Sequence, residues 1–103
     1  MTLGKRSAIV SHMKLINWNA EKNQLLLSER GISFEDVVVC IQQGVLLDIV
    51  EHPNKEKYQN QRMFIIDLEN YAYLVPYVET EKEIFLKTII PSRKATKLYL
   101  GGK

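Results

Sequence analysis

The strongest constraint on the fold is a series of four β-rich runs joined by links too short for crossover connections. The runs, which are rich in β-branched and aromatic residues, cover residues 45–51, 62–68, 71–78 and 84–90. A parallel pair needs a connection of a dozen or more residues, whereas a short turn can join two antiparallel strands. The sequence therefore predicts a four-stranded antiparallel meander.

Two positions within these runs carry more specific predictions. Glu69 and Asn70 form the whole link between the second and third runs, and Asn tolerates a positive φ, so this link predicts a tight hairpin. Pro76 lies inside the third run and has no N–H to donate. It predicts a bulge or an unpaired position at that point.

Helical segments flank the four runs. Asn19 is a candidate N-cap for a first helix that ends before Gly31, and Ser33 with Asp36 has the spacing of a capping box for a second helix. Ser92 is a candidate N-cap for a short C-terminal helix over residues 93–100. We expect the helices to pack on one face of the sheet. The fold class is then α+β, with two N-terminal helices, the meander and one C-terminal helix.

Composition limits the class of protein. The chain has 103 residues, of which 46% are hydrophobic and 25% are charged, as expected for one compact domain. The single cysteine, Cys40, leaves no disulfide framework and favours a reducing, cytoplasmic location. No apolar run approaches the roughly 20 residues that span a bilayer, so no membrane association is expected.

The two ends of the chain differ from its body. Residues 1–12 lack periodicity and run into Ser11-His12-Met13, which is typical of a cloning junction, so we expect an expression tag outside the fold and a native start at Met13. Residues 13–103 are then a single domain. From Met13 to residue 83 there are 7 Lys/Arg and 12 Asp/Glu, but residues 84–103 hold 5 Lys/Arg and no acid. Such a basic block can attract phosphate backbones, although it can also be a solvated helix end.

Polar side chains at the ends of the runs are the candidates for chemistry: Glu51, His52, Arg62, Tyr77, Lys87, Arg93 and Lys94. Antiparallel pairing can bring such positions onto one face of the sheet. RNA cleavage by the ribose 2′-OH needs only cations, an acid and a base, which this set can supply. The alternative is a polar sheet face without activity. His52 is the only histidine after Met13, and no glycine-rich loop is present, so we expect neither a metal nor a cofactor.

Three segments resemble the BrnT-like toxins. Residues 16–23 read Ile-Asn-Trp-Asn-Ala-Glu-Lys-Asn, residues 29–37 read Glu-Arg-Gly-Ile-Ser-Phe-Glu-Asp-Val, and residues 87–96 read Lys-Thr-Ile-Ile-Pro-Ser-Arg-Lys-Ala-Thr. They occur in the family's order, and the resemblance extends from Ile16 to about Leu100, nearly all of the chain after Met13. Two departures occur: Glu29-Arg30-Gly31 replaces the common Lys-His-Gly, and Thr88, next to Lys87, replaces a frequent Arg.

The resemblance implies the toxin of a type II toxin–antitoxin pair, with a RelE-like fold and ribonuclease activity that inhibits translation. It also implies a ribbon-helix-helix antitoxin and contact with operator DNA only through that complex. Arg62 and Arg93 match basic positions of the family, and Glu51 and His52 fall in its acidic loop.

We therefore expect Arg62 and Arg93 to hold one phosphate and Glu51, His52 or Tyr77 to transfer protons. Lys87, Lys94 and Lys97 are the expected RNA-binding residues. The alternative is a non-catalytic RNA- or protein-binding module of the same fold. A small metabolic enzyme is a third possibility, although so small a domain encloses little volume.

Overall fold

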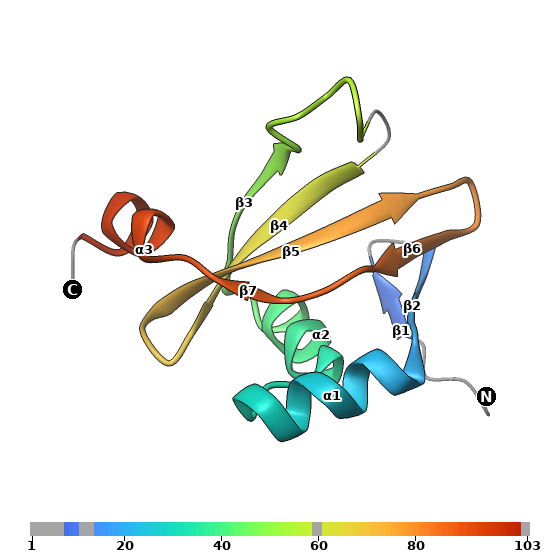
Figure 1. Cartoon of the computed structure of the whole chain (residues 1–103), viewed down its shortest axis with the longest axis horizontal. Coiled ribbons are helices and arrows are strands. Elements are labelled where there is room, and N and C mark those ends of the chain that lie inside the picture. Colours follow the sequence, from blue (N-terminus) through green and yellow to red (C-terminus); the bar gives the residue numbers. More distant parts are fainter. Residues whose placement is uncertain (1–7, 11–13, 59–60, 102–103) are drawn as a thin grey trace.

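The computed structural model describes residues 8–10, 14–58 and 61–101, and Figure 1 shows their arrangement. Along the chain the elements are β1 (Ala8–Val10), β2 (Lys14–Trp18), α1 (Ala20–Arg30), α2 (Phe34–Gln42), β3 (Leu46–Glu51), β4 (Gln61–Leu68), β5 (Tyr71–Glu79), β6 (Glu83–Leu86), β7 (Ile90–Pro91) and α3 (Arg93–Leu100). The α+β class is confirmed. In this described part of the chain, no helix is both long and apolar enough to cross a bilayer.

The sheet contains the expected meander but is larger and mixed. Its strand order is β1-β2-β6-β5-β4-β3, and β3 to β6 are antiparallel neighbours in sequence order. The prediction of only four antiparallel strands is wrong, because β2 adds in parallel to β6 and β1 adds to β2. Ile16 pairs with Ile84 in this parallel ladder and is fully buried.

The last predicted run is divided into two strands. β6 pairs with Tyr77–Glu79 of β5, and β7 pairs with Tyr73 and Leu74 of β5, so Pro76 lies where one partner ends and before the other begins. The Pro76 carbonyl accepts a hydrogen bond of 2.8 Å from the backbone N–H of Lys87. The interruption expected at Pro76 is thus a break in the neighbouring strand, and the pairing of β5 with β4 continues through it.

The local stop and start signals agree with the structure. The side chain of Asn19 accepts from the N–H of Lys22, and α1 ends at Gly31 with φ 71°. Ser33 and Asp36 form the reciprocal capping box of α2, and Ser92 caps α3. In the hairpin, Glu69 and Asn70 both have positive φ, 56° and 68°. Each signal acts within a few residues, which is why the sequence is sufficient to locate it.

Two cores form on opposite faces of the sheet. On one face Phe34 and Val37 of α2 pack with Phe64 and Ile66 of β4, and on the other Ala95 of α3 packs with strand residues such as Ile65. Successive strand residues point to opposite faces, so α3 lies on the face opposite α1 and α2. The expectation that all helices share one face is wrong for α3. In Figure 1, α1 and α2 lie together and α3 lies apart from them.

Part of the N-terminal segment belongs to the sheet. Ala8, Ile9 and Val10 pair with Ile16, Leu15 and Lys14 as β1, although all of residues 1–12 were expected outside the fold. The reason is physical: β2 needs a partner on the side away from β6, and two of these three residues are β-branched. The rest of residues 1–12 lies outside the described residues, and its origin as a tag stays a prediction.

Candidate functional site

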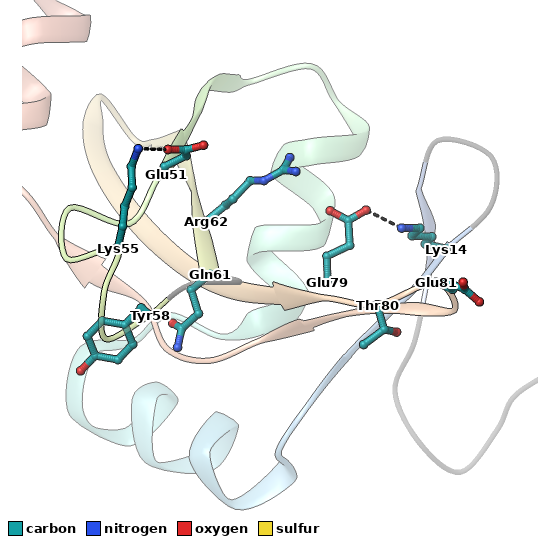
Figure 2. A pocket seen from close by; sticks show the side chains of 9 residues that line it. All are labelled: Lys14, Glu51, Lys55, Tyr58, Gln61, Arg62, Glu79, Thr80 and Glu81. Atoms are coloured by element: carbon teal, nitrogen blue, oxygen red, sulfur yellow. Dashed lines mark hydrogen bonds and ion pairs between the residues drawn. The ribbon is translucent and has the colours of Figure 1, made fainter.

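A groove of about 580 Å³ lies at the end of the sheet where β4 begins and β5 ends (Figure 2). Its walls come from β2, the end of β3, the following loop, and the link after β5. The lining residues are Lys14, Glu51, Lys55, Tyr58, Gln61, Arg62, Glu79, Thr80 and Glu81. Three carboxylates and three cations among them make the lining close to neutral and strongly polar.

Arg62 occupies the centre of this groove. It pairs with Glu51 of β3 on one side and with Tyr77 of β5 on the other. Directly opposed residues of antiparallel strands point to the same face, so the structure brings together three of the sequence-predicted site residues. In Figure 2 the guanidinium of Arg62 extends between the carboxylates of Glu51 and Glu79.

Each of these two carboxylates is held by its own lysine. Lys55 Nζ lies 2.7 Å from Glu51 Oε1, and Lys14 Nζ lies 2.6 Å from Glu79 Oε2. The residues of the first pair are four positions apart in the sequence. Those of the second pair are 65 positions apart and join β2 to β5. The groove therefore presents one arginine flanked by two Lys–Glu pairs, which we call the Arg62 cluster: Lys14, Glu51, Lys55, Arg62 and Glu79.

The charges in the Arg62 cluster favour an ionised Glu51. The hydrogen bond from Lys55, the charge of Lys55 and, more weakly, the charge of Arg62 lower the pKa of Glu51 below its ordinary value. The same pairing raises the pKa of Lys55. At neutral pH Glu51 is consequently an ionised carboxylate, next to cations that can hold an anionic group.

Tyr77 lies opposite Arg62 on the neighbouring strand and does not line the groove. It is only 2% exposed, and its ring stacks on Phe64 with centroids 4.1 Å apart. Burial raises the pKa of Tyr77, and the charge of Arg62 opposes that shift. Tyr77 therefore stays protonated next to Arg62, and it is absent from the lining of the groove where the sequence predicted proton transfer.

His52 is engaged by its own loop. Its Nδ1 accepts a hydrogen bond of 3.1 Å from the backbone N–H of Asn54, and its ring packs 4.1 Å from the ring of Tyr58. It is absent from the lining of the groove. The structure gives His52 a loop-supporting position, not one beside Arg62.

Arg93 lies far from Arg62. The backbone N–H of Ser92 donates to Ala72, and Ala72 pairs with Asp67, which is five residues along β4 from Arg62. At about 3.3 Å per residue this is roughly 16 Å along the strand. Arg93 also begins α3, which packs on the opposite face of the sheet. The structure therefore does not bring the two arginines to one phosphate.

The remaining predicted cations are also outside the groove. Arg93, Lys94 and Lys97 are exposed along α3, and we call them the α3 basic surface. Lys87 follows β6, with its Nζ 5.8 Å from the centroid of the Phe85 ring. These residues form peripheral cationic positions.

Sequence reasoning missed several groove residues, above all Lys14 and Glu79. A signal was present for both, because Lys14 alternates with Ile16 and Trp18, and Glu79 alternates with Tyr77. Using it required recognition of β2 as a strand and of its parallel pairing with β6.

Comparisons with known proteins give no relative for this chain. No protein-family model matches it, and neither curated proteins nor solved structures yield a match. Among the described residues, no group of three or more His, Cys, Asp or Glu is arranged to hold a metal ion. The candidate site is therefore interpreted from its own geometry.

Proposed function

We propose that this protein is a toxin-like endoribonuclease that cleaves RNA in the groove around Arg62. The observation that carries the proposal is the Arg62 cluster, with one guanidinium between two carboxylates that are each paired with a lysine. A phosphodiester whose own 2′-OH is the nucleophile needs a cation for its oxygens, a base on one side and an acid on the other. The cluster contains all three kinds of group.

In the Arg62 cluster, Arg62, Glu51 and Lys14 each have their own role in the reaction. The guanidinium of Arg62 binds two non-bridging phosphate oxygens, because its planar fork matches their geometry. Glu51 accepts the proton of the 2′-OH while the new O2′–P bond forms. The P–O5′ bond breaks, and the leaving oxygen takes a proton from Lys14 on the other side of Arg62. The products are a 2′,3′-cyclic phosphate, which water can open to a 3′-phosphate, and a 5′-hydroxyl. All the proton carriers are side chains, so the proposal includes no metal or cofactor.

Two further features support this proposal. The resemblance of three segments to the BrnT-like toxins points to a ribonuclease with a RelE-like fold, and the helix pair followed by a meander fits that expectation. The α3 basic surface provides cations that can contact RNA phosphates outside the groove. We extend the proposal to a cytoplasmic location, inhibition of translation and a ribbon-helix-helix antitoxin, with operator DNA contacted only through that complex.

A second candidate function is a non-catalytic module that binds RNA or protein. One observation favours it: neither Tyr77 nor His52 lines the groove, and Arg93 is remote. Such a module needs the cations of the groove but not the proton-accepting oxygen of Glu51. Replacing Glu51 by Gln therefore separates the two, since it abolishes cleavage while largely retaining binding.

A growth assay tests the proposed function. Expression of the wild-type chain in bacteria should slow growth, and Arg62→Gln should relieve the effect while the far-UV circular dichroism stays the same. Arg93→Gln is the matched control, and we expect it to remain toxic because Arg93 lies on the other face. A wild type without any effect on growth, or an Arg62→Gln variant as toxic as the wild type, contradicts the proposal.

A further inference from the structure

The loop after β3 and the first residue of β4 contribute two side chains, Tyr58 and Gln61, that the mechanism above does not use. Both line the groove that contains Arg62. In Figure 2 they lie together at the start of β4, on the side away from the guanidinium of Arg62. Gln61 and Arg62 are consecutive strand residues, so their side chains leave β4 toward opposite faces.

In the described part of this loop, residues 52–58, hydrogen bonds position Tyr58. The N–H of Tyr58 donates to the Asn54 carbonyl at 3.0 Å, and the N–H of Gln61 donates to the Tyr58 carbonyl at 3.2 Å. The side chain of Asn54 accepts from the N–H of Lys57 at 3.1 Å, and His52 donates from its backbone to the Gln61 carbonyl at 3.2 Å. These bonds tie the loop to the start of β4, so Tyr58 is held next to the groove.

The ring of Tyr58 contacts His52 and Lys57 and stays partly exposed. The centroids of the His52 and Tyr58 rings are 4.1 Å apart. Tyr58 is half-buried, so part of its ring is accessible. The exposed Lys57 places its ammonium 5.4 Å from the ring centroid. An ammonium of an exposed lysine gives way readily to a planar group that stacks, and it is then free to contact a phosphate.

We infer that Tyr58 and Gln61 form a subsite for a base of single-stranded RNA, at the side of the groove away from the phosphate position at Arg62. Aromatic rings stack on the faces of bases, and a glutamine amide offers one acceptor and two donors to a base edge. The inference rests on the proposed function, because the phosphate at Arg62 sets the register of the strand. In this inference, Tyr58 and Gln61 determine which base the enzyme prefers.

The inference is tested with RNA hexanucleotides that cannot be cleaved. Labelled hexanucleotides with 2′-O-methyl riboses and a single type of base are titrated against the full chain by fluorescence anisotropy. A hexamer of the same backbone without bases is titrated in parallel. We expect Tyr58→Leu to weaken binding of at least one base-containing hexamer by about fivefold or more, as for loss of one base stack, and to leave the abasic hexamer unchanged. Tyr58→Trp should retain the binding, and Gln61→Ala should alter the preference among bases.

Two controls make the result decisive. Arg62→Gln should weaken the base-containing and abasic hexamers alike, whereas Tyr71→Leu, outside the groove at the other end of the sheet, should change neither. Tyr58→Leu that affects both hexamers equally, or neither, overturns the subsite, and so does a wild type that binds no hexamer. Because these RNAs are not cleaved, a base-dependent effect of Tyr58 together with no cleavage of ordinary RNA overturns the proposed activity and leaves the subsite standing.

Discussion

At the scale of single residues, a hydrogen bond between Tyr99 and Asp48 anchors α3 to the edge strand β3. The phenol of Tyr99 donates to Asp48 Oδ2 at 2.6 Å, and the N–H of Ile49 donates to Oδ1 at 2.8 Å. The bond from Tyr99 is the main cause that lowers the pKa of Asp48, and the bond to Asp48 raises the pKa of Tyr99. The pair therefore stabilises α3 only while Asp48 is ionised and Tyr99 is protonated.

This pair predicts a pH-dependent effect of Tyr99→Phe on thermal stability. A carboxyl whose pKa is lower in the folded than in the unfolded protein stabilises the fold at pH values above its unfolded pKa. This stabilisation is lost as the pH falls through its folded pKa. We expect the variant to melt below the wild type at neutral pH, and the difference to vanish as the pH falls below about 4. Melting curves of both proteins across this range measure it. A difference that is the same in acid as at neutral pH means that the bond has no such role.

The candidate site shows what single residues could and could not reveal. Glu51, Arg62 and Tyr77 were expected to converge, and register alone places them on one face. Arg93 was expected to join them. The face of the sheet on which α3 packs depends on the contacts of Ala95, and no local sequence pattern predicts these contacts. Whether Tyr77 lines the groove also depends on its burial, which is a property of the tertiary structure.

At the scale of elements, the hairpin between β4 and β5 contains a strained position. Glu69 has φ 56°, and a left-handed conformation costs a residue with a side chain roughly 1–2 kcal/mol. Glycine avoids this strain but loses about 0.5–1 kcal/mol in chain entropy. We therefore expect Glu69→Gly to raise the free energy of unfolding by up to about 1 kcal/mol, which corresponds to roughly 4–8 °C in melting temperature. Asn70→Gly should gain less, because Asn tolerates this conformation. Destabilisation by Glu69→Gly contradicts the argument.

A second prediction concerns β1. Deletion of residues 1–12 should lower the melting temperature by several degrees, because it leaves one edge of β2 without its antiparallel partner. Replacing Ala8, Ile9 and Val10 by glycine in the full chain should have a similar effect, since glycine weakens strand pairing. Thermal melts of the three proteins decide this. A deletion that melts with the wild type shows that the pairing of β1 adds no stability.

The elements differ in how far the sequence predicts them. The three helices were located from their caps. In the segments that resemble the BrnT-like toxins, two further side chains accept hydrogen bonds from backbone N–H groups, as the caps do. Asn23 accepts from the N–H of Phe34 at 2.7 Å, and Thr96 accepts from the N–H of Ala72 at 2.9 Å. These residues build the corner between α1 and α2 and the anchor of α3. By contrast β2 was missed, because its partner β6 lies more than sixty residues along the chain and parallel pairing leaves no local turn to detect.

At the scale of the whole molecule, the positive charge is divided between two regions. The groove holds the Arg62 cluster, while the α3 basic surface lies on the other face at the opposite end of the strands. We predict that Lys97→Gln lowers RNA affinity about equally for all sequences and reduces the slope of log affinity against log salt by about one ion contact. The rate of cleavage at saturating RNA should not change. Anisotropy titrations over a range of salt concentrations test this, and a changed base preference contradicts it.

Cleavage of single-stranded RNA in excess chelator tests the central claim most directly. The purified chain is incubated with end-labelled RNA, and the product ends are identified by mass spectrometry. We predict 2′,3′-cyclic or 3′-phosphate ends and 5′-hydroxyl ends for the wild type, a loss of about a hundredfold or more for Arg62→Gln, and nearly full activity for Arg93→Gln. Absence of cleavage by the wild type, activity that is lost in chelator and restored by magnesium, or full activity of Arg62→Gln contradicts the account.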